Sequence, residues 1–138
     1  MVQVSVEYEG DLHCLSIHGP SQAALSTDAP KDNLGRGDGF SPTDLTATSL
    51  GVCMLTTMAI TAAKRSLDVE LLGARATVRK HMTATAPRRI QKIEVNVEIP
   101  LPGSHSARET LEEAALNCPV ALSLHPDIEK AVSFSWMR

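Results

Sequence analysis

A long uncharged run, from Leu45 to Ala63, constrains the fold of this chain more than any other feature. Signals for a helix start precede the run: Ser41 suits the N-cap, Pro42 the first helical position and Asp44 the third. A helix that is apolar around its whole circumference must be surrounded by other groups. Its serine, threonine and glycine residues, and the lack of aromatic belts, favour a core helix over a membrane span. We therefore predict one long central helix.

The size of the chain determines how such a helix can be covered. A chain of 138 residues, 43% apolar and 21% charged, indicates a single globular domain over residues 1–138. One copy of that size does not easily wrap an apolar helix on every side, whereas two copies can pack their small-residue faces together. We expect a homodimer with the paired helices at its centre.

The remaining pattern predicts an α+β domain with antiparallel strands around the central helix. Strands are expected at 2–8, with one face buried, and at 12–18, followed by a long loop over 28–41. Two antiparallel strands, 73–82 and 88–99, are joined by a hairpin, and the second turns Ile93, Val95, Val97 and Ile99 inward. A helix over 106–117 with Ser106 as its cap, a short helix after Pro119 and a strand over 128–136 complete the chain.

Charge and cysteine usage exclude several classes of function. A net charge of −3 offers no positive field for nucleic acid or an anionic membrane. The N-terminal segment lacks the pattern of a signal peptide, so we expect a cytoplasmic protein. Three widely spaced cysteines fit neither a secreted disulfide framework nor a paired-cysteine metal site. Cys14 with His13 and His18 is better explained by packing than by metal binding.

Cys53 lies about three turns into the predicted helix, beyond the reach of the helix dipole. Burial alone would raise the pKa of its thiol, so a reactive Cys53 requires a cation from elsewhere. Arg36, in the preceding loop, is the nearest candidate in sequence, and arginine stays charged and presents two donors. Asp44 can hold the guanidinium in place, in addition to capping the helix.

Cys118 precedes Pro119, which is able to open a short helix, and a thiolate is favoured at a helix N-terminus. One deep cysteine and one at a helix start suggest an attacking and a resolving thiol. Buried cysteines with only a packing role are common, so spacing alone leaves both interpretations open.

Two segments resemble one known family. GFSPTDLTATSLGVCMLTTMAITAAK, residues 39–64, is similar to the signature of the OsmC/Ohr family (osmotically induced protein C and organic hydroperoxide resistance proteins), and NCPVALSL, residues 117–124, to its second cysteine motif. The resemblance implies an OsmC-like fold, an intertwined homodimer with active sites at the subunit interface, and a thiol peroxidase without metal, flavin or haem. It also implies an external dithiol reductant, such as a lipoylated protein.

The same resemblance assigns roles to residues. Cys53 becomes the peroxidatic cysteine, Cys118 the resolving cysteine and Arg36 the arginine that holds the thiolate and orients an organic hydroperoxide. Well-studied hydroperoxide reductases carry a glutamate at the position of Thr43, whereas here the acid is Asp44, as in the wider OsmC-like branch. The alternative function is therefore a small-molecule binding or thiol-sensing module with little peroxidase activity.

Overall fold

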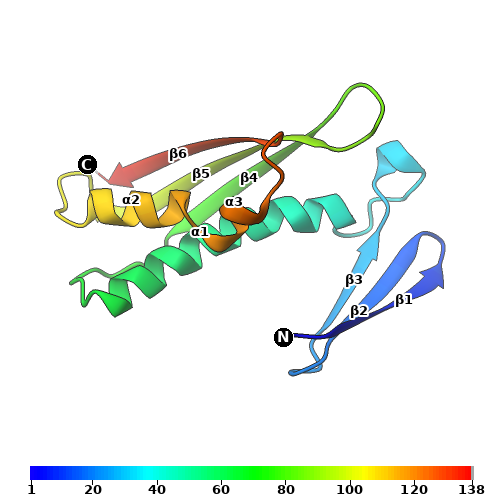
Figure 1. Cartoon of the computed structure of the whole chain (residues 1–138), viewed down its shortest axis with the longest axis horizontal. Helices are drawn as coiled ribbons and strands as arrows, with labels where there is room; N and C mark the ends of the chain where they lie inside the picture. The colour runs from blue at the N-terminus through cyan, green and yellow to red at the C-terminus, as the bar shows by residue number, and fades with distance from the viewer. Residues whose placement is uncertain (138) are drawn as a thin grey trace. The chain divides into compact units, whose positions relative to one another are not determined.

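The computed structural model describes residues 1–137 and divides the chain into two compact units, Met1–Thr46 and Ala47–Arg138. Helix α1 (Pro42–Lys64) begins in the first unit and continues through the second (Figure 1).

The first unit is a three-stranded antiparallel sheet. Strands β1 (Val4–Gly10), β2 (His13–His18) and β3 (Ala24–Asp28) lie in the order β1-β2-β3, so β2 is central. The first two strands confirm the sequence prediction. Strand β3 was not predicted, because its five residues carry no clear apolar alternation and it is stabilised by pairing with β2. The short 3-10 helix η1 (Lys31–Asn33) lies inside the predicted loop.

The prediction of a buried face on β1 is wrong for the chain as described. Val4, Val6 and Tyr8 share one face of β1, and all three are exposed. The unit's strands form a single layer, so its apolar side chains are not packed against a second layer of the same unit. The residues that the first unit does bury are all polar: Thr27, Asp28 and Ser41.

The second unit contains a mixed sheet rather than the purely antiparallel one that was expected. Strands β4 (Arg75–Met82), β5 (Ile90–Pro102) and β6 (Glu129–Met137) lie in the order β4-β5-β6. The β4–β5 hairpin is antiparallel, as predicted, whereas β5 and β6 are parallel. Between them, helices α2 (Arg108–Leu116) and α3 (Pro119–Ser123) return the chain to the starting end of the sheet, as a parallel connection requires.

The core of the second unit lies between this sheet and the helices on one of its faces (Figure 1). The inward residues of β5 are those that alternation predicted, and each is at most 2% exposed. Helix α1 contributes one buried stripe at intervals of three or four residues, formed by Ala47, Leu50, Gly51, Met54, Met58 and Ala62. Hydrophobic burial along this seam is the main force that holds the unit together.

The other sides of α1 are not covered within the chain. Val52 and Ile60 are about half exposed, at 55% and 50%, so the helix is not enclosed on every side. By length and composition alone α1 could also cross a membrane, with a mean hydropathy of 1.5, but core helices of soluble proteins share that property.

Two helix starts follow the sequence signals and one does not. The Asp44 N–H donates to Ser41 Oγ at 3.1 Å and the Ser41 N–H donates to Asp44 Oδ2 at 2.9 Å, which makes a reciprocal capping box. Pro119 opens α3 as predicted. The prediction of Ser106 as the cap of α2 is wrong, since the N-cap is Ala107, whose N–H donates to His105 Nδ1 instead.

Candidate active site

Cys53 lies on the stretch of α1 that passes over strand β4. Two residues before it, Gly51 allows the close approach, because a Cβ added there would be only 2.6 Å from Val78 Cγ2. The packing of Gly51 against Val78 therefore sets the distance between α1 and β4 next to Cys53. Cys53 is half-buried, packs against the core of the second unit and is not in a disulfide.

Three donors surround the Cys53 sulfur. Burial by itself raises the pKa of this thiol, but hydrogen bonds from the Val120 backbone N–H, the Thr57 hydroxyl and the Cys118 thiol outweigh it and leave the pKa below its ordinary value. The Thr57 contact joins Oγ1 to Sγ over 3.7 Å, one helical turn along α1. The thiolate form of Cys53 is thus favoured by groups of the second unit alone.

Cys118 experiences the opposite effect. It is fully buried at the start of α3, and this burial raises the pKa of its thiol. The Ala121 backbone N–H lowers the pKa of Cys118, although the Cys118 side chain does not form an N-cap hydrogen bond to α3. The neighbouring Cys53 raises the pKa of Cys118 further, because a thiolate at Cys53 both accepts its proton in a hydrogen bond and repels a second negative charge.

The structure therefore brings together two of the residues that the sequence singled out. Cys53 and Cys118 are 65 positions apart but share a hydrogen bond, with Cys53 as the more acidic thiol and Cys118 as the proton donor. A thiolate beside a protonated thiol can attack an electrophile, and the second thiol can then condense with the product.

Arg36 and Asp44 belong to the first unit, whereas both thiols belong to the second. Arg36 Nε lies 3.0 Å from Asp38 Oδ2 and its side chain is exposed, so in this conformation its ion pair is with Asp38. Asp44 serves in the capping box of α1. The predicted contacts of Arg36 with Asp44 and with Cys53 stay predictions.

Sequence reasoning missed two contributors to the site. Thr57 was treated only as one of several polar residues of the helix, although its spacing of four from Cys53 could have identified it. Val120 acts through its backbone N–H, one of the donors that the start of α3 leaves without an intrahelical partner. No side-chain pattern in a sequence reveals a donor of that kind.

Comparison with known proteins decides the family. The OsmC-like protein profile matches residues 35–132, which include both cysteines. This chain belongs to the OsmC-like protein family. The resemblance drawn from the two cysteine motifs, and the α+β fold it implied, are thereby confirmed. None of the curated proteins matches the chain.

Solved structures agree with this membership. An osmotic stress induced and detoxification response protein, so described, from Psychrobacter arcticus 273-4 is 41% identical, with a TM-score of 0.88 over 97% of this chain and 96% of that one. The OsmC like protein of Mycoplasma pneumoniae is 17% identical, with a TM-score of 0.80 over 100% and 98% of the two chains. An organic hydroperoxide resistance protein from Legionella pneumophila is 15% identical, with a TM-score of 0.76 over 98% and 96%. The last two similarities establish the shared fold alone.

This OsmC-like protein also contains an apolar cavity in its second unit. The cavity measures about 570 Å³ and lies between the C-terminal half of α1 and the segment that follows it. Its lining includes Leu55, Met58, Ala62, Leu67 and Leu71. Such a volume falls within the range of small-ligand sites.

Proposed function

We propose that this OsmC-like protein is a cysteine-based peroxidase that reduces organic hydroperoxides. The observation that carries the proposal is the hydrogen-bonded pair of Cys53 and Cys118, in which Cys53 is the more acidic thiol and Cys118 stays protonated beside it. A peroxidatic cysteine needs its thiolate form, and a resolving cysteine needs to be within reach.

The proposed reaction has two steps. The Cys53 thiolate attacks the terminal oxygen of ROOH, the O–O bond breaks, and the alkoxide takes a proton to leave as ROH, so that Cys53 becomes a sulfenic acid. The Cys118 sulfur then attacks the Cys53 sulfur, loses its proton, and hydroxide departs as water, which leaves a Cys53–Cys118 disulfide. An external dithiol, such as that of a lipoylated protein, reduces this disulfide and completes the cycle.

Arg36 and Asp44 have supporting roles in the proposal. The guanidinium of Arg36 holds the Cys53 thiolate and orients the peroxide, after it exchanges its exposed ion pair with Asp38 for one with Asp44. Replacing Arg36 with alanine should then raise the pKa of Cys53 and slow its oxidation. If the pH profile of Cys53 alkylation in Arg36→Ala is the same as in the unaltered chain, Arg36 does not belong to the site.

A homodimer with active sites at the subunit interface is part of the proposal. Its support is the apolar surface that one chain leaves uncovered: Val6 on β1 is 66% exposed and Val52, next to Cys53, is 55% exposed. Exposed apolar groups gathered on a sheet face and on a core helix are typical of association surfaces. Light scattering with size-exclusion chromatography should give twice the chain mass, and Val6→Lys should shift it towards a monomer.

The direct test is one equivalent of cumene hydroperoxide added to the reduced protein, followed by non-reducing peptide mass spectrometry. We expect a Cys53–Cys118 disulfide with one equivalent of cumyl alcohol. Cys53→Ser should form neither product, Cys118→Ser should stop at the sulfenic acid, and Cys14→Ser, the matched control, should behave like the unaltered chain. Thiols that stay free in the unaltered chain refute the peroxidase proposal.

The cavity of the second unit favours one alternative, a small-molecule binding module with little peroxidase activity. Its apolar lining and volume suit a hydrophobic ligand. Met58→Gln places a polar group in that lining. Under the alternative, an apolar fluorescent probe binds the unaltered chain and loses affinity in Met58→Gln, while peroxide leaves both thiols reduced.

A further inference from the structure

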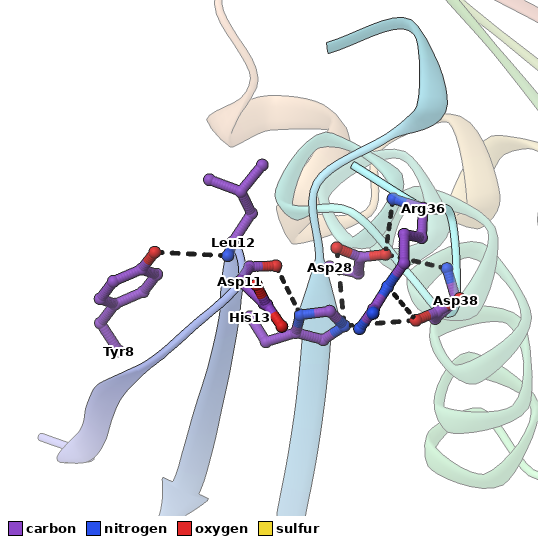
Figure 2. A network of polar contacts seen from close by, with 7 residues as sticks. All are labelled: Tyr8, Asp11, Leu12, His13, Asp28, Arg36 and Asp38. Atoms are coloured by element: carbon purple, nitrogen blue, oxygen red, sulfur yellow. Dashed lines mark hydrogen bonds and ion pairs between the residues drawn. The ribbon is translucent and has the colours of Figure 1, made fainter. Parts of the chain in front are cut away.

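One imidazole and two carboxylates meet at the end of the first unit's sheet. They belong to β2, β3 and the loop after β3, and none of these elements contains Cys53 or Cys118. The register of β2 and β3 places His13 opposite Asp28, and the loop that follows β3 brings in Asp38. His13 Nε2 lies 3.6 Å from Asp28 Oδ1 and 3.5 Å from Asp38 Oδ2. Figure 2 shows the three side chains pointing toward one another.

The ring orientation of His13 leaves one nitrogen for this cluster. Its Nδ1 lies 2.7 Å from the Asp11 carbonyl oxygen, which can only accept, so Nδ1 carries a hydrogen and donates it (Figure 2). Nε2 therefore faces the two carboxylates. A histidine that ligates a metal is commonly fixed in this way, with its other ring nitrogen donating to a backbone carbonyl.

Asp28 provides the second, independent observation. The residue is only 2% exposed, and its Oδ2 accepts the backbone N–H groups of Arg36 and Asp38 at 3.2 and 3.0 Å. Its Oδ1 is buried and has no hydrogen-bond partner among the described residues. A buried polar atom without a partner is costly and rare, and this one is directed at Nε2.

The spacing of these atoms fits a metal better than direct hydrogen bonds. A hydrogen bond from nitrogen to oxygen spans about 2.7–3.2 Å, and both separations from Nε2 exceed it. Four-coordinate Zn²⁺ lies about 2.0–2.2 Å from nitrogen and oxygen ligands, so tetrahedral ligand atoms are about 3.4 Å apart. We propose that His13 Nε2, Asp28 Oδ1 and Asp38 Oδ2 form a site for a divalent transition-metal ion of the Zn²⁺ type.

Arg36 is the group that competes with such an ion. Its Nε lies 3.0 Å from Asp38 Oδ2, the same oxygen that the proposal assigns to the metal. The arginine side chain is well exposed, so it can leave this oxygen without burying its charge. A bound ion takes over the neutralisation of both carboxylates, and the fourth coordination position is left for water.

The test is a titration of the full, reduced chain with Co²⁺, followed by displacement with Zn²⁺. Tetrahedral Co²⁺ absorbs in the visible range, and a cysteine ligand adds intense thiolate charge-transfer bands in the near ultraviolet. We expect one Co²⁺ per chain, visible bands without the thiolate bands, and full displacement by Zn²⁺.

Variants separate this site from any other. His13→Gln and Asp38→Asn should each weaken Zn²⁺ binding at least tenfold, whereas His18→Gln should leave it unchanged. His18 is the matched control because it lies on the same strand, with Nδ1 against the Ser21 hydroxyl rather than a carboxylate. Asp38 is chosen for this comparison because removing the Asp28 charge would weaken two backbone hydrogen bonds as well. Circular dichroism and thermal melts confirm that each variant folds.

Three results overturn the proposal: no bound metal, affinity that is unaltered in both His13→Gln and Asp38→Asn, or thiolate bands that disappear in Cys53→Ser. The readout is metal affinity rather than peroxide turnover. Failure here therefore leaves the peroxidase proposal untouched, and failure of the peroxidase proposal leaves this site untouched.

Discussion

The two units of this chain bury different kinds of residue. In the second unit the buried positions are apolar or glycine and form one cluster around β5 and α1. In the first unit the buried positions are Thr27, Asp28 and Ser41, while apolar side chains such as Val6 stay exposed. Hydrophobic burial is the main source of stability in the second unit, whereas the first depends on strand pairing and on polar contacts of its loop.

The difference also separates two kinds of chemistry. In the second unit, burial in the apolar core raises the pKa of Cys118, whereas hydrogen bonds outweigh burial and lower the pKa of Cys53. A polar pocket fixes carboxylates and an imidazole for binding a cation, and the first unit has that arrangement around Asp28. Substitutions matched between the two units test this contrast.

The largest expected effect comes from removing a core side chain of the second unit. Leu111→Ala, at a fully buried position of α2, should lower the free energy of unfolding by about 2–5 kcal/mol, since it leaves a cavity. Leu25→Ala, at a position of β3 that is 42% exposed, should lower the free energy of unfolding by less than about 1 kcal/mol. Urea denaturation of both variants measures the contrast. Equal losses would show that Leu25 is buried in solution, and the contrast between the units would fail.

Glycine substitutions should give the next largest effect. Gly51→Ala places a Cβ 2.6 Å from Val78 Cγ2, and overpacking of this kind costs about 1–3 kcal/mol. Gly39→Ala in the first unit meets no atom within 4 Å and should be nearly neutral. The double variant Gly51→Ala/Val78→Ala should be less destabilised than the two single changes added together. Strict additivity in thermal unfolding contradicts the predicted clash.

A smaller effect is expected on the reactivity of the thiol. Thr57→Val removes a hydrogen bond that lowers the pKa of Cys53, so alkylation of Cys53 at neutral pH should slow about fivefold, as expected for a bond of about 1 kcal/mol. The pH profile should move to higher pH, while Thr57→Ser should retain the original profile. Alkylation of Cys14, in the first unit, serves as the internal control. An unshifted profile in Thr57→Val means that the threonine does not act on the thiolate.

The smallest effect concerns a surface pair on the second unit's sheet. A hydrogen bond from His81 lowers the pKa of Glu94, with Nε2 and Oε2 2.5 Å apart. A carboxyl whose folded pKa is depressed stabilises the protein above its unfolded pKa and loses that contribution as pH falls through the folded pKa. Glu94→Gln should therefore reduce stability slightly at pH 5–6, and this loss should become smaller as the pH falls. Exposed Glu7→Gln on β1 is the control in acid titrations of unfolding.

Much of the fold follows from local patterns. Alternation along β5 gave the inward positions of Ile93 and Val97, and the Ser41 and Asp44 signals gave the start of α1, because these features depend on neighbours in the chain. The predicted start of α2 was wrong: the N-cap is Ala107, one residue after Ser106, and its N–H donates to His105 Nδ1, a contact that no serine-cap pattern indicates. Strand β3 and the parallel pairing of β6 escaped prediction, because both depend on distant partners.

The family, and the two motifs that contain Cys53 and Cys118, could be identified from the sequence alone, because each motif is a short local pattern. Which thiol is the more acidic depends on contacts between elements that are distant in the sequence. The Val120 N–H reaches Cys53 from another element, and the burial of Cys118 is a property of the folded core. The same reason applies to His13 and Asp28: strand register brings them opposite each other, and no spacing along the chain encodes that contact.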